Sequence, residues 1–124
     1  MLIFPSLPTE KEAAVASKFV VKKDRGGQFM FNLVANNGRI VLTSERYKTK
    51  ASAINGIKSV QKHANAVKNF ESSRTKSGGL SFVLKASNGE PIGRSQVYRG
   101  SSGCSGGIAS VKRCAPAGKI VDDS

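Results

Sequence analysis

Few side chains in this sequence of 124 residues are suited to catalysis. The sequence contains one histidine, His63, and two cysteines, Cys104 and Cys114. A catalytic site needs a nucleophile, a base or a set of metal ligands held in register. The cysteines have neither the CxxC spacing nor the mixed His/Cys spacing of a zinc site. We therefore predict no catalytic residue, no metal site, no cofactor and no enzymatic activity.

An internal repeat shows which polar groups have a counterpart. Fourteen of the 46 positions from 19 to 64 are identical to the residue 51 positions later, with no gap. At this offset His63 aligns with Cys114, and no carboxylate within the repeats aligns with another carboxylate. A histidine or paired-carboxylate site preserved by duplication is therefore not supported. Three polar or aromatic pairs do recur: Ser44 and Ser95, Tyr47 and Tyr98, and Ser59 and Ser110.

Four of the recurring side chains belong to a repeated helix or precede it. Tyr47 and Tyr98 come just before the two helices and are expected to fasten each helix start to the sheet. Ser59 and Ser110 face away from the apolar stripe of each helix, where serine readily bonds to local backbone. Two interpretations of these serines stay open. They form a helix-to-helix hydrogen bond or are simply solvated, or they belong to a surface that binds a partner.

Positive charge is the strongest compositional feature of the chain. Twenty Lys and Arg stand against eight Asp and Glu, and the excess lies in the repeats, with +8 over residues 18–65 and +6 over residues 66–115. Such a surface is typical of proteins that bind nucleic acid or another polyanion, and it equally keeps a protein soluble. The cations expected at the turn edges are Lys22, Lys23, Arg25, Arg74 and Lys76.

The cysteines are predicted to be unpaired. Both fall on the second helix, where ten residues separate them by about 15 Å along the axis. A disulfide needs Cα atoms within roughly 7 Å. Cys104 is expected in the core, and Cys114 is expected to be a partly exposed thiol. Free thiols suit a reducing compartment, so we predict a cytoplasmic protein.

Alternating apolar residues predict a three-stranded meander in each copy. The strands of the first copy fall at residues 18–24, 28–36 and 39–45. Phe29 and Phe31 share the face assigned to the core, which weakens any platform for stacking nucleic-acid bases on the outer face. Asn-Gly pairs follow the second strand of each copy and predict two-residue hairpin turns, since both residue types tolerate positive φ.

The second copy adds two expectations of its own. Pro91 cannot donate to a ladder, so its strand is expected to lie at a sheet edge or to begin late. Lys119, Ile120 and Val121 are β-prone and predict a closing strand, while residues 122–124 are expected to be loose.

A helix follows each meander, at about residues 50–64 in the first copy. Ala53 and Ile57 lie on its apolar stripe, and the second copy repeats the pattern. Glycine recurs in the middle of both helices, at Gly56 and Gly107, although it costs roughly 0.5–1 kcal/mol there relative to alanine. We expect another backbone, from a strand or from the other helix, to approach closely at these points.

The repeats account for residues 18–124, which we interpret as one domain with units at about 18–66 and 67–122. About 50 residues seldom bury enough apolar surface to fold alone. Residues 1–17 have no counterpart and are interpreted as a flexible N-terminal extension. No apolar run approaches the ~20 residues that a membrane span needs, so no membrane association is expected.

Together these motifs resemble a known family. They are Gly-Ile-x-Ser-Val at residues 56–60 and 107–111, the Phe-x-Leu strand, the Asn-Gly turn, and Ser-x-x-Tyr before each helix. The set is similar to the YegP-like family of small bacterial proteins and covers about residues 18–122. The resemblance implies an α+β fold of two tandem β-β-β-α-β repeats, which form one antiparallel sheet with both helices packed on one face and exchange their C-terminal strands. It implies no activity, cofactor or catalytic residue.

Two functions fit the sequence, and an enzyme with an unrecognised site ranks behind both. The first is a non-enzymatic binding or interaction module of the cytoplasm, which fits the missing catalytic set. The alternative is a weak, sequence-independent nucleic-acid binder that uses the basic surface. The sequence leaves the partner open, and it leaves open whether the protein is a monomer or a weak homodimer.

Overall fold

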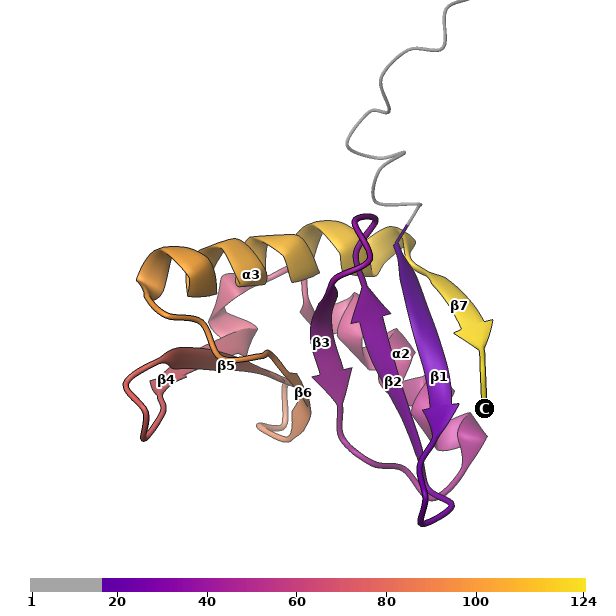
Figure 1. The fold of residues 1–124 in the computed structure, drawn as a ribbon. Coiled ribbons are helices and arrows are strands. Elements are labelled where there is room, and N and C mark those ends of the chain that lie inside the picture. The colour runs from indigo at the N-terminus through magenta and orange to yellow at the C-terminus, as the bar shows by residue number, and fades with distance from the viewer. Residues whose placement is uncertain (1–16) are drawn as a thin grey trace, which may run out of the picture.

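The computed structural model describes residues 17–124, and Figure 1 colours the elements in chain order. The first unit comprises β1 (Lys18–Lys23), β2 (Phe29–Val34), β3 (Ile40–Ser44) and α2 (Lys50–His63). The second unit comprises β4 (Phe70–Arg74), β5 (Leu80–Lys85), β6 (Pro91–Arg94) and α3 (Ser101–Cys114). Short 3-10 helices follow the two α-helices, η1 (Val67–Asn69) and η2 (Ala115–Ala117), and β7 (Lys119–Asp122) is the last strand. The extension expected at residues 1–17 lies outside the described residues, apart from Ser17.

Seven strands form one sheet in the order β4-β5-β6-β3-β2-β1-β7. All neighbours are antiparallel except β7, which is parallel to β1 with Phe19 opposite Ile120. The predicted α+β fold of two tandem repeats is confirmed, but the sheet is mixed. The direction of β7 follows from α3, whose far end lies beside Ser17. There the backbone N–H of Lys119 donates to the Ser17 carbonyl (3.2 Å), so β7 starts at the same end of the sheet as β1.

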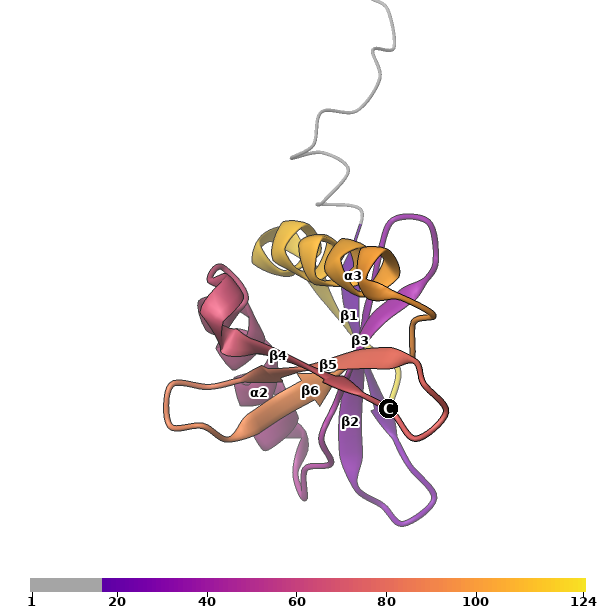
Figure 2. The ribbon, with the colours of Figure 1, turned by 90° about the vertical axis from the view of Figure 1, so that its left-hand side faces the viewer.

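The two units interlock where β3 meets β6. Only two residue pairs join these strands, Thr43 with Arg94 and Ser44 with Gly93. The sheet twists strongly here, and in Figure 2 β4 and β5 run across the direction of β2. Each helix packs against strands of its own unit and also against one strand of the other unit: α2 contacts β6, and α3 contacts β3. The units therefore share one core.

The core contains the residues that the alternating pattern predicts. Phe31 and Phe82 are fully buried at equivalent positions of β2 and β5, and Ile57 is fully buried on α2. Its counterpart on α3, Ile108, is half-buried and packs against the same cluster. Both helices therefore cover the face that carries the phenylalanines. No helix within residues 17–124 is long and apolar enough to cross a membrane.

The hairpin turns differ from the prediction. Gly38 donates its N–H to the Ala35 carbonyl (2.9 Å), and Ala35 donates to the Arg39 carbonyl (2.8 Å), which closes a three-residue loop. Only the glycine has positive φ (84°), and the Asn37 side chain accepts the N–H of Arg39 at 3.0 Å. The other three hairpins, with Gly27, Gly78 and Gly89, repeat this pattern.

Of two smaller expectations about the second copy, one holds in one of its two forms and the other is corrected. Pro91 is the first residue of β6, so the late start holds, but β6 lies inside the sheet and not at an edge. The residues expected to be loose are held in place. Asp122 belongs to β7 and pairs with Lys50 at 2.8 Å, and Asp123 donates its N–H to the Val21 carbonyl at 2.8 Å. Hydrogen bonds from Lys50 and Ser124 hold the pKa of the Asp122 carboxyl well below its usual range.

Candidate anion-binding groove

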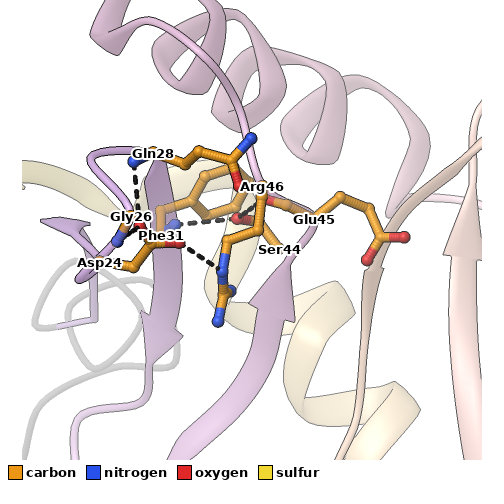
Figure 3. A network of polar contacts seen from close by, with 7 residues as sticks. All are labelled: Asp24, Gly26, Gln28, Phe31, Ser44, Glu45 and Arg46. Atoms are coloured by element: carbon orange, nitrogen blue, oxygen red, sulfur yellow. Dashed lines mark hydrogen bonds and ion pairs between the residues drawn. The ribbon is translucent and has the colours of Figure 1, made fainter.

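The recurring serines of the meanders, Ser44 and Ser95, are structural. Ser44 Oγ accepts a hydrogen bond from the N–H of Phe31 (2.8 Å) and donates to the Glu45 carbonyl (2.7 Å), as Figure 3 shows. Ser95 makes the equivalent pair of bonds in the second unit, at 2.9 and 2.7 Å. In each unit the hydroxyl takes the place of a ladder carbonyl where the third strand ends.

A carboxylate organises the turn beside Ser44. Asp24 Oδ1 accepts the N–H groups of Gly26 and Gln28, each at 2.9 Å, and Oδ2 pairs with Arg46 Nε at 3.0 Å. In Figure 3 the Arg46 side chain reaches the Asp24 carboxylate. Thr75 stands in place of Asp24 in the second unit, so this ion pair belongs to the first unit alone. The network fixes a turn and leaves no open site.

Replacing Ser44 by alanine is expected to lower the free energy of unfolding by about 1–3 kcal/mol, because the buried N–H of Phe31 loses its acceptor. Ser95→Ala is the matched control. Ser95 is only half-buried, so water can replace its hydroxyl and the loss should be smaller. Urea unfolding of both variants measures the difference, and equal losses would contradict a special role for burial at Ser44.

The recurring tyrosines explain the recurring helix glycines. Tyr47 exchanges two backbone hydrogen bonds of 2.7 Å with Phe29, and its ring stacks on Phe31 with centroids 6.3 Å apart. The phenol then lies over Gly56, where a Cβ atom would overlap its oxygen. Burial, with the nearby Glu45 charge, raises the pKa of this phenol. The backbone of Tyr47 therefore fastens the segment before α2 to the sheet, and its ring packs on the middle of the helix.

The predicted partner of the helix glycines is wrong. A tyrosine side chain of the same unit occupies the space, and not a strand or the other helix. Tyr98 repeats the arrangement over Gly107 and stacks on Phe82 with centroids 6.3 Å apart. Tyrosine and glycine therefore recur together because each helix needs a gap in which the phenol ring fits.

Ser59 takes part in a bond within its own helix. Its Oγ lies 3.3 Å from His63 Nδ1, and that nitrogen donates to the Ser59 carbonyl at 2.8 Å. Nε2 of the same ring accepts the N–H of Ser87 at 3.3 Å. The histidine thus ties the end of α2 to the β5–β6 turn of the other unit. Ser110 is half-buried beside the β2–β3 turn and Arg39, so the helix-to-helix hydrogen bond is not formed.

Both cysteines are free and buried. Cys104 lies in the core as predicted, with its sulfur 3.7 Å from the Ser72 hydroxyl. Cys114 was expected to be partly exposed, and this is wrong, since only 2% of the residue is exposed. Ser17 covers the end of α3 there and donates its hydroxyl to the Cys114 carbonyl at 2.9 Å. Burial raises the pKa of the Cys114 thiol.

The cations predicted at the turn edges are exposed but are not brought together. Lys22, Lys23 and Arg25 lie at the end of β1 and in the turn after it, where Lys23 Nζ stands 5.6 Å from the centre of the Phe29 ring. Arg74 and Lys76 lie at the end of β4 and in the turn after it. Figure 1 shows these two turns in different parts of the molecule. They form two separate cationic edges.

A cationic groove lies elsewhere, between the end of α2 and the tip of the β5–β6 hairpin. We call it the α2 groove, and its volume is about 540 Å³. The residues that line it are Lys62, His63, Lys68, Asn69, Glu71, Lys85, Ala86, Ser87 and Gly89. Three lysines face one carboxylate, and that carboxylate pairs with Lys85 at 2.8 Å. The groove therefore keeps a net positive charge, which makes it the concave site best suited to an anion.

The sequence does not single out the α2 groove. Lys62 ends the first unit, while Lys68 and Lys85 belong to the second, and only the packing of α2 against the second unit brings them together. One signal was available. Lys85 is a cation where the first copy has Val34, although the inward-facing positions of this strand stay apolar in both copies.

Comparison with known sequences places the chain in a family. Residues 24–71 and 76–122 each match the sequence profile of a domain of unknown function, DUF1508. The chain belongs to the DUF1508 family. Each matched segment begins in a hairpin turn and contains two strands, a helix and the start or whole of the following strand. The first DUF1508 match therefore ends inside β4, although β4 pairs with β5 of the second unit.

Curated relatives of this DUF1508 protein carry the name UPF0339. One from Pseudomonas aeruginosa is 46% identical over 110 residues, which cover 89% of this chain and all of that protein. One from Bordetella pertussis is 46% identical over 108 residues, or 87% of this chain and 97% of the relative.

Solved structures agree with the fold of this DUF1508 protein. The solution NMR structure of yegP from E. coli, a protein of unknown function, has a TM-score of 0.82 and 37% identity, and covers 86% of this chain and 92% of that one. A UPF0339 protein from Shewanella oneidensis has a TM-score of 0.81 and 36% identity, with 86% and 91% covered. The YegP-like resemblance is thus confirmed, and it carries no established activity.

Proposed function

We propose that this DUF1508 protein is a binding module that associates with nucleic acid through its cationic surface and without reading the sequence of the bases. The main support is the number of cations left without a carboxylate. Nineteen Lys and Arg lie within residues 17–124, and four of them form ion pairs, namely Arg46, Lys50, Lys85 and Arg94. The other fifteen have no carboxylate partner among the described residues, so their charge is available to neutralise phosphates.

The position of the aromatic rings favours contacts with phosphates over contacts with bases. Phe19, Phe31 and Phe82 are fully buried. All the other phenylalanines and tyrosines within residues 17–124 belong to the core or pack against it. Proteins that stack bases present rings on an exposed face among their cations. The least buried rings within residues 17–124, those of Phe29, Tyr47 and Tyr98, are half-buried against the core. A surface whose lysines and arginines are accompanied by no fully exposed ring among these residues suits backbone contacts, which are independent of sequence.

The histidine and the two cysteines support a role without catalysis. Both ring nitrogens of His63 are engaged with backbone groups, and both thiols are buried. Within the described part of the chain, no three His, Cys, Asp or Glu side chains are grouped to hold a metal. We also infer that the protein works in the cytoplasm, which the unpaired thiols support.

Fluorescence anisotropy with a labelled single-stranded oligonucleotide tests the proposal. If about five phosphates are neutralised, the affinity should fall roughly 100-fold between 50 and 200 mM salt. Two oligonucleotides of unrelated sequence should bind equally well. A peptide nucleic acid of the same sequence, which lacks phosphates, is the control and should not bind. Absence of binding at 50 mM salt, or binding that is indifferent to salt, would overturn the proposal.

A further inference from the structure

Each unit carries a groove beside the tip of its second hairpin, and the two grooves are related by the repeat. We call the one in the first unit the β7 groove, because Asp123, just after β7, lines it. Six positions of the α2 groove have their counterpart 51 residues earlier in the β7 groove. These counterparts are Lys18, Val20, Val34, Ala35, Asn36 and Gly38. Duplication therefore built two similar hollows, whose chemistry can be compared position by position.

The chemistry of the two grooves has diverged. Where the β7 groove has Val20 and Val34, the α2 groove has Glu71 and Lys85, which form an ion pair. The β7 groove contains two lysines and one aspartate, whereas the α2 groove contains three lysines and one glutamate. The α2 groove is thus the more cationic of the two.

The helix end supplies the decisive difference. Lys62 and Lys68 line the α2 groove, and their counterparts Arg113 and Lys119 do not line the β7 groove. Neither Lys62 nor Lys68 has a carboxylate partner among residues 17–124, while Lys85 is held by Glu71. Two lysines with no counter-ion therefore face the same hollow from α2 and η1.

Further hydrogen-bond donors line the α2 groove. Asn69 Nδ2 donates one of its two N–H groups to the His63 carbonyl at 2.8 Å, which leaves the second N–H available. The Ser87 hydroxyl makes no hydrogen bond to a described residue, although its backbone N–H is held by His63. Phosphate oxygens accept hydrogen bonds from lysines and from neutral donors, and this groove is lined by both.

We propose that the α2 groove is a phosphate site that takes a backbone phosphate of a single nucleic-acid strand between Lys62 and Lys68, and that the β7 groove is not an equivalent site. The proposal rests on the proposed function and gives it a location. It predicts that binding is concentrated at one of the two grooves, although both units are cationic and share one fold.

The test compares two double variants that remove the same charge from equivalent positions. Lys62→Gln with Lys68→Gln alters the α2 groove, and Arg113→Gln with Lys119→Gln alters the positions 51 residues later, which line neither groove. All four side chains are exposed, so both variants should stay folded. The probe is a labelled twelve-nucleotide oligothymidine, whose binding is measured by fluorescence anisotropy from 50 to 200 mM salt.

The groove variant should bind at least about tenfold more weakly at 50 mM salt, and the slope of log K against log salt should fall in magnitude by about 0.7 for the one phosphate that is no longer neutralised. The matched variant should change affinity less than about threefold, since neither Arg113 nor Lys119 lines the α2 groove. In ¹⁵N NMR spectra of the unaltered protein, the oligothymidine should shift the amide signals of Asn69 and Ser87 more than those of Lys18 and Asn36.

Three outcomes would overturn the site. Equal losses in both double variants would mean that charge acts diffusely, and the nucleic-acid proposal would survive without the groove. Polyglutamate that binds as tightly and shifts the same amides would show that the groove does not select phosphate. Oligothymidine that fails to bind the unaltered protein would remove both the site and the proposed function.

Discussion

Phe31→Ala is expected to lower the free energy of unfolding by about 3–5 kcal/mol, the usual cost of truncating a fully buried phenylalanine. Phe31 has no exposed surface and joins three parts of the first unit. Its ring meets Phe19 edge-on at 5.8 Å and stacks against Tyr47 at 6.3 Å. It also lies close to Gly56 on α2. Truncation therefore leaves a cavity between the sheet and the helix, bordered by groups that have no room to collapse.

Phe29→Ala is the matched control for this prediction. Phe29 lies two residues earlier on β2 and faces the same side, but it is only half-buried. Its truncation should cost clearly less, because water already reaches part of the ring. Chemical unfolding followed by circular dichroism measures both. Similar losses for the two variants would show that Phe31 does not hold the special place that its contacts indicate.

Gly107→Ala should lower the free energy of unfolding by about 1–3 kcal/mol, the range for an overpacked core, despite the better helix propensity of alanine. The added methyl group would overlap the phenol oxygen of Tyr98 and stand 2.6 Å from its Cζ atom. Gly106→Ala is the neighbouring control. A Cβ atom at Gly106 meets nothing within 4 Å, so that variant should raise the free energy of unfolding by about 0.5–1 kcal/mol.

A double-variant cycle identifies the cause of the Gly107 effect. In a Tyr98→Ala background the phenol is gone, so Gly107→Ala should become neutral or stabilising. Thermal or urea unfolding of the four proteins gives the coupling. If Gly107→Ala stays equally harmful without the ring, the glycine is needed for some reason other than the tyrosine.

Features with a local cause were predictable from the sequence. The alternation around Phe31 places the core face of β2 correctly, and the 51-residue offset identifies the two similar units. The helix predicted at about residues 50–64 ends at His63. These results follow from periodicity, which depends only on neighbours along the chain.

Features that depend on contacts between separate elements of the fold were not predictable from the sequence. Nothing near Gly107 in the sequence says that a phenol fills its gap, since the tyrosine reaches it only through the packing of the helix on the sheet. Cys114 was misplaced because its cover comes from Ser17, 97 residues away. The α2 groove escaped notice for the same reason, since Lys62 and Lys85 come from different units.

The pairing of β7 with β1 has a consequence for synthesis of the protein. Phe19 and Ile120 are partners although they lie 101 residues apart in the sequence. This contact is therefore expected to form after the contacts between neighbouring strands. On the ribosome, β1 can pair with β2 early, but its other edge stays open until residues 119–122 have left the exit tunnel. Nascent chains therefore carry an unprotected strand edge from the emergence of β1 until the emergence of β7.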